Sequence, residues 1–341
     1  MPLPVAFVGF HHGHAFSLYR DLEEHPGVEI VAACEEDPAA RDAATGRGIT
    51  ITHTSYEAML REVPCEAVAC CEWYGMRGPR LIQALEAGKH VICDKPLCVS
   101  LDELARMEKT SESKHLKIGC QLPMPYHSPF VTARTLIVSG AIGEVQSVTF
   151  NGAHALNYEG RPSWMFDEQK YGGTINDIAV HGIDALPWLT GRKFAAVIAA
   201  RTWSTRENAA TSERGKFKDG GVVLFTLDNG GAAYGDVSWL SPEGAKYGVP
   251  FYWRFTVHGD AGALETSWHA DHVALHARDA IEVHKEPLRG VEGATYIGDW
   301  LLDIANTPAK DRLHTERIIA SSRVALLAQH AADSGKRDLP V

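Results

Sequence analysis

Short apolar runs alternate with helical patterns over the first 120 residues, and this feature constrains the fold most. The apolar runs predict strands at 5–10, 28–34, 67–71, 90–94 and 117–121. Segments of helical pattern lie between and after them, at 15–24, 38–45, 55–61, 79–87 and 100–113. Such an alternation is typical of a parallel sheet covered by helices. We therefore predict an α/β domain over residues 1–121.

The pattern changes after Gln121. Helices are expected at 129–139 and 174–189, with a strand at 145–152 between them. Strand-like runs then follow one another at 195–203, 220–228, 231–240, 251–259, 262–268, 272–277 and 280–285. They predict one large antiparallel or mixed sheet, an α+β arrangement. Residues 122–341 are predicted to form a second domain, whose last helix, 312–334, is expected to pack back on the first.

Composition narrows the class of protein. A chain of 341 residues is about right for two domains. Its net charge of -10 would repel a nucleic-acid backbone, and its apolar runs are too short to span a membrane. Seven cysteines lie between Cys34 and Cys120 without a C-x-x-C pair, as expected for core residues in a reducing compartment. A cytoplasmic protein with no nucleic-acid or membrane partner is predicted.

The stretch VAFVGFHHGHAF, residues 5–16, has the shape of a dinucleotide-binding turn between a strand and a helix. Backbone N–H groups and the helix dipole at such a turn favour an anion. The G-x-G-x-x-G pattern falls on Gly9, His11 and His14, so only its first position matches. Gly13 is expected to restore some freedom to the turn, and His12 to supply a further side-chain donor.

Glu35 strengthens this interpretation because it ends the second strand, where an acid binds ribose hydroxyls. Glu36 and Asp37 follow and would repel a 2′-phosphate, which favours NAD over NADP. One alternative is a plain strand–turn–helix with surface histidines. A metal site in His11-His12-Gly13-His14 is a weaker alternative, since no carboxylate or cysteine lies at ligand spacing, and no metal is predicted.

Asp94-Lys95-Pro96 closes the fourth strand. Ligands bind at the carboxyl ends of strands in open α/β sheets, so Lys95 is placed to touch both a cofactor and a substrate hydroxyl. Its positive charge would lower the pKa of that hydroxyl. The alternative is a solvated surface lysine.

The segment YGGTINDIAVHGIDALPWLTG, residues 171–191, carries a second group of candidate residues. Thr174 and Asp177 are spaced for a capping box, a structural role. His181 is expected one turn beyond Asp177 on the same helix face, where a carboxylate would orient a general base. Asp184 lies in an apolar stretch and needs a partner.

Taken in order, the Gly9 turn, Glu35, AGKHVICDKP, SGAIGEV and GGTINDIAVHGID resemble the glucose–fructose oxidoreductase / inositol dehydrogenase (Gfo/Idh/MocA) family over nearly the whole chain. The resemblance implies a doubly wound Rossmann domain followed by a domain with a large open sheet. It implies assembly into a homodimer or homotetramer through that sheet, NAD(P) as cofactor, and sugars or polyols as substrates. Matched by motif, Lys95, Asp177 and His181 would be the catalytic set.

The chain departs from the family pattern at three places. Histidines replace glycines at positions 11 and 14, and Asp94 replaces a glutamate. The stretch after the third strand reads CEWYGMRGP, where Trp73 and Tyr74 would narrow the nicotinamide pocket. The predicted cofactor-binding residues are Gly9, His11, His12, Gly13, His14, Glu35, Glu72, Trp73, Asp94 and Lys95.

Substrate contacts are expected mainly from HALNYEGRPSWMF, residues 154–166, which is dense in hydroxyl, amide, guanidinium and indole groups. The predicted residues are Gln121, His154, Tyr158, Arg161, Trp164, Asp177 and His181. Ordinary interface packing is the alternative for this loop.

The predicted reaction is hydride transfer between NAD and a hydroxyl carbon of a sugar, polyol or derivative. His181, oriented by Asp177, would take the hydroxyl proton, and Lys95 would stabilise charge on the oxygen. Three other classes stay open: a redox-neutral enzyme that oxidises transiently and then eliminates or epimerises, a non-catalytic NAD or sugar binder, and a metal-dependent enzyme using the histidine turn.

Overall fold

The computed structural model describes residues 1–205, 217–290, 293–307 and 311–341. The chain divides into two compact units. The first unit comprises residues 1–122, 162–172 and 295–320, and the second comprises 123–161, 173–294 and 321–341. The sequence predicts one domain boundary, at residue 121. Residues 162–172 and 295–320 nevertheless belong to the first unit, although they follow that boundary. A change of pattern along the chain does not reveal such returning segments.

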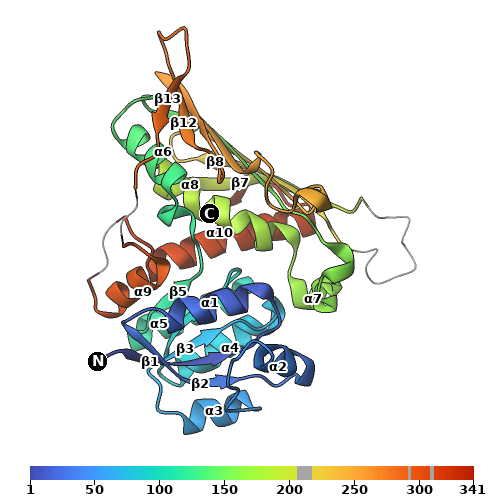
Figure 1. Ribbon diagram of the computed structural model, residues 1–341. Helices are drawn as coiled ribbons and strands as arrows, with labels where there is room; N and C mark the ends of the chain where they lie inside the picture. Colours follow the sequence, from blue (N-terminus) through green and yellow to red (C-terminus); the bar gives the residue numbers. More distant parts are fainter. Residues whose placement is uncertain (206–216, 291–292, 308–310) are drawn as a thin grey trace. The chain divides into compact units, whose positions relative to one another are not determined.

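The first unit is built on a parallel five-stranded sheet (Figure 1). Its strands, in the order β2-β1-β3-β4-β5, are β1 (Leu3–Val8), β2 (Val28–Cys34), β3 (Ala67–Cys70), β4 (His90–Cys93) and β5 (Ile118–Cys120). This is a doubly wound order, and its switch point lies between β1 and β3. β3 is buried throughout, β1 from Val5 and β4 from Val91, as their continuous apolar runs predicted. All seven cysteines are buried, and they form no disulfide among the described residues.

Helices cover both faces of this sheet. The helices of this unit are α1 (Gly13–Glu23), α2 (Pro38–Thr45), α3 (Tyr56–Glu62), α4 (Tyr74–Glu86), α5 (Leu101–Lys114) and α9 (Tyr296–Ile304), together with the short α7 (Glu168–Tyr171), which packs against α4. Figure 1 draws α1 and α3 on opposite sides of the strands. Tyr296 of α9 donates to Asp21 of α1 over 2.5 Å, so α9 shares the α1 face. The prediction that α4 begins at Pro79 is wrong by five residues, because this proline, a common first residue of helices, lies inside the helix.

The second unit is built on a nine-stranded sheet in the order β13-β12-β11-β10-β6-β9-β8-β7-β14. Neighbouring strands are antiparallel except β6 and β9. The strands are β6 (Val145–Ala153), β7 (Phe194–Trp203), β8 (Gly220–Leu227), β9 (Ala232–Ser238), β10 (Tyr252–Gly259), β11 (Gly262–Thr266), β12 (His272–Ala277), β13 (His284–Pro287) and β14 (Leu339–Pro340). The predicted large, mostly antiparallel sheet is confirmed. The strand expected at 280–285 is displaced toward the C-terminus, and β14 was not predicted.

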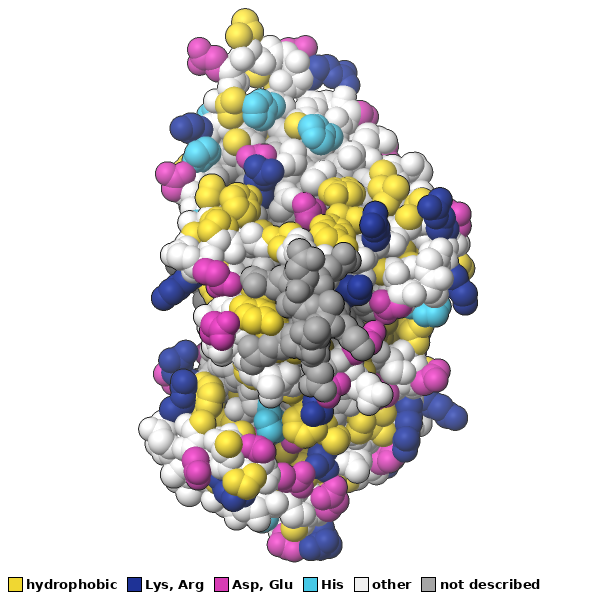
Figure 2. Space-filling model, turned by 90° about the vertical axis from the view of Figure 1, so that its right-hand side faces the viewer, with side chains coloured by type: hydrophobic (Ala, Val, Ile, Leu, Met, Phe, Trp, Pro, Cys, Tyr) yellow, Lys and Arg dark blue, Asp and Glu magenta, His cyan; other side chains and the backbone are white. Residues whose placement is uncertain are grey.

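Helices α6 (Ser128–Val138) and α8 (Val180–Thr190) pack on this sheet, and α10 (Thr315–Ser334) begins in the first unit and ends in the second. Gly182 of α8 lies so close to Phe150 of β6 that an added Cβ would come within 2.4 Å of its ring. Asp184 has the partner that its burial requires, since Ser321 donates to it over 3.0 Å. Among the described residues, none of the helices is both long and apolar enough to cross a membrane. Lysine and arginine side chains are scattered over the face drawn in Figure 2.

Candidate active site

The turn after β1 depends on Gly9. Its φ of +88° is in the left-handed region, and an added Cβ would stand 2.5 Å from the backbone nitrogen of Glu72. The ends of β1 and β3 therefore approach each other closely only with glycine here. Gly13 is different: it opens α1 without a positive φ, and an added Cβ would meet nothing within 4 Å. The expectation that Gly13 restores freedom to the turn is wrong; it keeps space open at the helix N-terminus.

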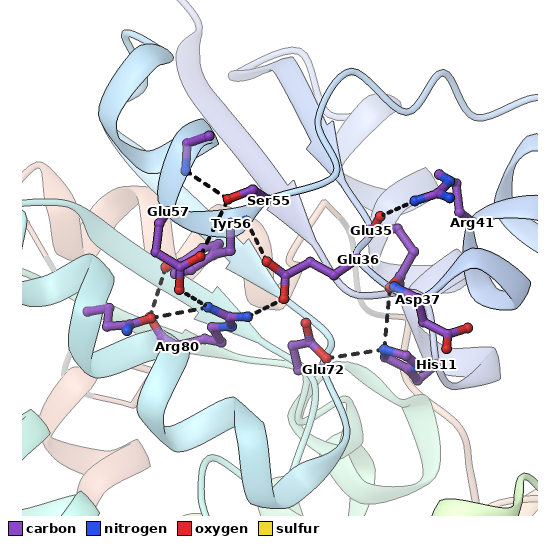
Figure 3. A network of polar contacts seen from close by, with 12 residues as sticks. His11, Glu35, Glu36, Asp37, Arg41, Ser55, Tyr56, Glu57, Glu72 and Arg80 are labelled. Atoms are coloured by element: carbon purple, nitrogen blue, oxygen red, sulfur yellow. Dashed lines mark hydrogen bonds and ion pairs between the residues drawn. The ribbon is translucent and has the colours of Figure 1, made fainter.

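His11 stands between two buried carboxylates (Figure 3). Its Nε2 lies 3.4 Å from Glu35 Oε1 and 3.3 Å from Glu72 Oε2. Burial alone would lower the pKa of His11, but the hydrogen bond to Glu72 and the charges of both glutamates raise it above its ordinary value. The raised pKa favours the cationic form of the imidazole, which offsets the two acids at the end of β1.

Glu35 is fully buried, and each of its oxygens accepts a backbone N–H group. Phe10 donates to Oε2 over 2.6 Å, and Asp37 donates to Oε1 over 2.8 Å. Burial raises the pKa of Glu35 more than His11 and these N–H groups lower it. This geometry gives Glu35 a role in fixing the two turns, and its expected role of accepting ribose hydroxyls stays a prediction.

Glu36 and Asp37, the two acids after Glu35, lie just beyond the end of β2. Glu36 accepts the N–H of Tyr56 over 2.8 Å and forms an ion pair with Arg80 (Figure 3). Arg80 also binds Glu57 over 2.7 Å. Asp37 is exposed and caps α2 by accepting the N–H of Ala40 over 2.8 Å. Arg80 offsets the charge of Glu36, whereas that of Asp37 faces solvent, and the opposition of this edge to a 2′-phosphate stays a prediction.

A second cluster joins the turn to the end of β4. His14 Nδ1 lies 3.1 Å from Asp94 Oδ1, and His12 Nδ1 lies 3.9 Å from Asp94 Oδ2. Asp94 is also bound by the fully buried Arg77, whose Nη2 is 3.4 Å from Oδ2. Burial would raise the pKa of Asp94, but His14, Arg77 and Lys95 hold it well below its usual range. The sequence did not indicate Arg77, because a helical arginine carries no motif of its own.

Lys95 is 4 % exposed and follows β4 directly, with a cis peptide bond to Pro96. Its Nζ lies 5.8 Å from the ring centre of Tyr74. The alternative of a solvated surface lysine is therefore wrong. An ammonium group in such surroundings is desolvated, which strengthens its interaction with any oxygen that is brought to it.

Trp164 belongs to the first unit with residues 162–166 of the predicted substrate loop, whereas residues 154–161 of that loop belong to the second. Its indole N–H donates to the carbonyl of His11 over 3.1 Å, and its ring packs against Tyr74 at 4.9 Å. Trp73 contacts His11 at 4.8 Å. Trp73 and Trp164 thus both pack on the histidine turn. Gln121, just after β5, has a buried Oε1 without a hydrogen-bond partner among the described residues.

The segment that carries Asp177 is a π-helical turn, Ile175–Ala179, leading into α8. Asp177 is fully buried, and His181 is partly exposed. The predicted capping box is wrong: Thr174 has helical φ and ψ and its hydroxyl donates to Lys218 O. Single π-helical turns inside helices are frequent at functional sites.

Trp253 contacts His181 with ring centres 5.3 Å apart. Its φ of +47° is rare for a bulky residue, and the register of β10 with β6 shifts there, as in a β-bulge. Gly152 opposite leaves room for the indole, since an added Cβ would be 2.7 Å from it. This strained residue was not predicted, because a bulge is invisible in an alternating strand pattern.

His154 lies in a shell of aromatic rings. Ring centres of Trp239, Tyr247, Tyr252 and Trp253 are 5.2 to 5.7 Å from its own. Its Nδ1 is 3.0 Å from Gly152 O. Arg161 stacks over Trp239 at 4.6 Å and donates to the carbonyls of Ala155 and Leu156, so it braces its own loop. Tyr158 is partly exposed in a short 3₁₀ turn.

The predicted site residues thus divide into two groups, one in each unit. Gly9, His11, His12, Gly13, His14, Glu35, Glu72, Trp73, Asp94, Lys95, Gln121 and Trp164 belong to the first unit, and His154, Tyr158, Arg161, Asp177 and His181 to the second. A joint catalytic set of Lys95, Asp177 and His181 draws on both units and stays a prediction.

Two family models match the chain. Residues 3–121 match the oxidoreductase family with an NAD-binding Rossmann fold, and residues 130–265 match the GFO/IDH/MocA C-terminal domain. The chain belongs to the Gfo/Idh/MocA family. The resemblance inferred from the motifs is confirmed, and so is NAD as the predicted cofactor of the N-terminal domain.

Curated relatives include D-glucoside 3-dehydrogenase of Escherichia coli, 26% identical over 59% of this chain and 57% of that protein. Inositol 2-dehydrogenase of Ralstonia nicotianae is 28% identical over 53% of this chain and 52% of that protein. The chain thus matches about half the length of these relatives. Among solved structures, an inositol dehydrogenase homologue of Azotobacter vinelandii in complex with NAD+ aligns over 100% of this chain and 97% of its own, with a TM-score of 0.81 and 18% identity, a likeness of fold.

The residues at the Gly9 turn fit a dinucleotide. The close approach at Gly9 and the open space at Gly13 leave the backbone of the α1 N-terminus accessible to a diphosphate. No acidic residue stands in the first turn of α1 to oppose such an anion.

Proposed function

We propose that this protein is an NAD-dependent oxidoreductase that transfers a hydride between NAD and a hydroxyl-bearing carbon of a sugar, polyol or derivative. The observation that carries the proposal is Lys95. It is a buried cation at the carboxyl end of a central parallel strand, next to the switch point where such sheets bind their ligands.

NAD, when bound, supplies the hydride acceptor. In the proposal Gly9 and Gly13 keep the backbone open for its diphosphate, and the acids Glu36 and Asp37 select against a 2′-phosphate. His11 and Glu35 fix the turn between β1 and α1, so the cofactor meets a preformed surface and less ordering entropy is lost on binding.

The chain's own residues provide the proton chemistry. Lys95 donates a hydrogen bond to the substrate hydroxyl and stabilises negative charge that develops on its oxygen. His181 takes the proton, with Asp177 on the same helical segment to favour its protonated form. Strong desolvation of Lys95 makes its charge more effective than it would be in water.

The second unit favours a polyhydroxylated ring as substrate. Aromatic rings around His154 and beside His181 present flat apolar faces, and polar atoms of Arg161 and Tyr158 lie on the adjoining loop. Sugar rings have apolar C–H faces with hydroxyls at their rims, which this mixture suits. The names of the curated relatives, a glucoside and an inositol dehydrogenase, support the same substrate class.

The experiment begins with a check for nucleotide carried through purification, followed by calorimetric titration with NAD and, separately, NADP. A screen of sugars, glycosides and polyols then follows NADH formation. Binding of NAD over NADP together with NADH release on one of these substrates supports the proposal. Retained NAD with substrate conversion but no net NADH would establish the redox-neutral alternative, and NAD binding without any conversion would establish a binding protein. Absence of binding to either nucleotide would refute the proposal.

We further propose that the open sheet of the second unit is a self-association surface. Leu224 of β8 and Tyr234 of β9 are directly paired across the two strands, and their side chains are 39% and 40% exposed. Adjacent exposed apolar side chains on one sheet face are typical of an interface. Light scattering should give a dimer or tetramer that the double substitution Leu224→Lys and Tyr234→Lys dissociates; a monomeric wild type would refute this.

A further inference from the structure

Three potential metal ligands converge where β1 and β4 end. His12, His14 and Asp94 each offer one ligand atom, and these atoms lie within 4.8 Å of one another. His12 and His14 flank the start of α1, whereas Asp94 follows β4, eighty residues later. No metal is predicted from the sequence, because no carboxylate lies at ligand spacing from the histidines. The fold brings the carboxylate of Asp94 to them.

The orientation of the imidazole nitrogens suits a cation. His12 Nδ1 accepts the N–H of His14 over 3.4 Å, a long hydrogen bond, so a metal ion that takes the lone pair of this nitrogen replaces only a weak contact. The same nitrogen lies 3.9 Å from Asp94 Oδ2. His14 Nδ1 approaches the other carboxylate oxygen, Oδ1, at 3.1 Å.

Positive charge near Asp94 is the strongest objection. Arg77 is fully buried, and its Nη2 is 3.4 Å from Asp94 Oδ2. However, its shorter contacts are to backbone carbonyls, with Nη1 at 2.7 Å from Pro96 O and 3.0 Å from Asp94 O. Arg77 therefore acts like the outer-shell partners that orient metal-binding carboxylates. Asp94 Oδ1, the oxygen nearer His14, is not the one that Arg77 contacts and can therefore bind a cation.

Burial differs among the three side chains in a way that matters for chemistry. Asp94 is 1% exposed and His12 10%, whereas His14 is 46% exposed. A site with three protein ligands and one solvent-facing side leaves a coordination position for water or another oxygen ligand. Two imidazole nitrogens with one carboxylate suit zinc, iron(II), cobalt(II) or manganese(II) better than calcium or magnesium.

We propose that His12, His14 and Asp94 form a binding site for one divalent transition-metal ion, with an open coordination position. The ion takes the place of any proton on the ligating nitrogens, and that proton passes to solvent. Binding therefore weakens as the pH falls.

The test uses full-length protein without a polyhistidine tag, stripped with a chelator and kept free of nucleotide and substrate. Titration with Zn²⁺ should show one saturable site per chain, and Co²⁺ should give visible absorption bands of a low-symmetry nitrogen–oxygen site. His14→Ala should raise the Zn²⁺ Kd by at least about 100-fold, since even outer-shell changes cost 10- to 100-fold. Asp94→Asn should do the same, and the half-exposed His14 makes its variant the safer one for folding.

His53→Ala is the matched control. His53 belongs to the same unit and lies 4.0 Å from Glu62, but it is not part of a three-donor group among the described residues. It should leave the Kd unchanged. No saturable uptake by the wild type, or equal affinity in the wild type and His14→Ala, would overturn the proposal. Because no nucleotide is present, either result is independent of whether the protein binds NAD.

Discussion

Histidines lie at the centre of two regions of this molecule, and the side chains that surround them differ in chemistry. In the first unit His11, His12 and His14 stand 3.1 to 3.9 Å from carboxylate oxygens. In the second unit His154 and His181 stand among aromatic rings whose centres are 5.2 to 5.7 Å away. Carboxylates are the nearest partners of the first group of histidines, although Trp73 and Trp164 also pack there, whereas the second group faces flat aromatic rings.

The two regions also hold their geometry by different means. Glu35, Glu72 and Asp94 are almost fully buried, which would be costly without cations and N–H donors beside them. The aromatic region instead depends on close packing and on one strained residue, Trp253. A charge substitution should therefore disrupt the first region, and a change of side-chain volume the second.

The largest expected effect is on the chemistry at Lys95. Lys95→Ala should lower kcat by roughly 100- to 10,000-fold, the usual contribution of positioned proton-transfer and charge-stabilising groups. The Kd for NAD, measured by calorimetry, should change far less. Lys89→Ala is the control, since Lys89 precedes β4 at its other end and donates to Cys65 O. A variant that loses NAD binding but keeps kcat would contradict the assigned role.

Two glycines of the same turn should respond in opposite ways. Gly9→Ala should cost about 3 kcal/mol or more of stability, because the left-handed φ and the overlap with Glu72 each carry a penalty. Gly13→Ala should leave the Tm within a few degrees but weaken NAD binding roughly tenfold, since its methyl group enters the space at the α1 N-terminus. Thermal melts and calorimetry separate the two. Equal NAD affinity in Gly13→Ala would place the diphosphate elsewhere.

Sequence periodicity predicted both sheets, because each strand's apolar pattern reports its own burial. The motif order predicted the family. The contacts across the chain could not be read in this way. Asp94 completes a cluster with histidines eighty residues earlier, and Trp164 returns to the first unit from a loop assigned to the second. Glu35 is predicted to meet a ribose, and the sequence did not show that both of its oxygens also accept backbone N–H groups of neighbouring turns.

Helical spacing also did not reveal where the backbone is irregular. A π-helical turn carries Asp177, and its expected relation to His181 one turn on stays a prediction. The bulge at Trp253 has no signature in YWRFTVHG. Both irregularities lie beside His181, as expected if local rules are violated mainly at functional sites.

The aromatic region is tested by filling the space under Trp253. Gly152→Ala places a methyl group 2.7 Å from the indole and should cost about 1–3 kcal/mol of stability. The KM for the sugar substrate should rise while the NAD Kd stays constant, because the displaced ring belongs to the second unit. Gly244→Ala, where an added Cβ meets nothing within 4 Å, is the matched control. An unchanged KM would mean that Trp253 has no part in binding the substrate.

The smallest effect concerns the pH dependence of the charged turn. Burial opposes protonation of His11, but Glu72 and Glu35 raise its pKa above the ordinary value of 6.5. Its stabilising contribution is therefore fully present below about pH 6.5 and is lost as the pH rises through the raised folded value. The Tm difference between the wild type and His11→Gln should accordingly be larger at pH 6 than at pH 9. About 1 kcal/mol shifts the Tm of a domain this size by roughly 2–4 °C, and we expect no more than that.

His25 gives the opposite sign in the same unit. Burial lowers the pKa of His25, and its Nδ1 accepts the N–H of Gly27 over 3.1 Å, so the neutral ring is favoured. Its contribution is present above about pH 6.5 and is lost as the pH falls through the lowered folded value. The Tm difference for His25→Gln should shrink toward low pH, where that for His11→Gln is at its largest. If both Tm differences changed in the same direction with pH, the carboxylates around His11 would not be charged in the folded protein. The contrast between a charged first region and an aromatic second region would then be contradicted at His11.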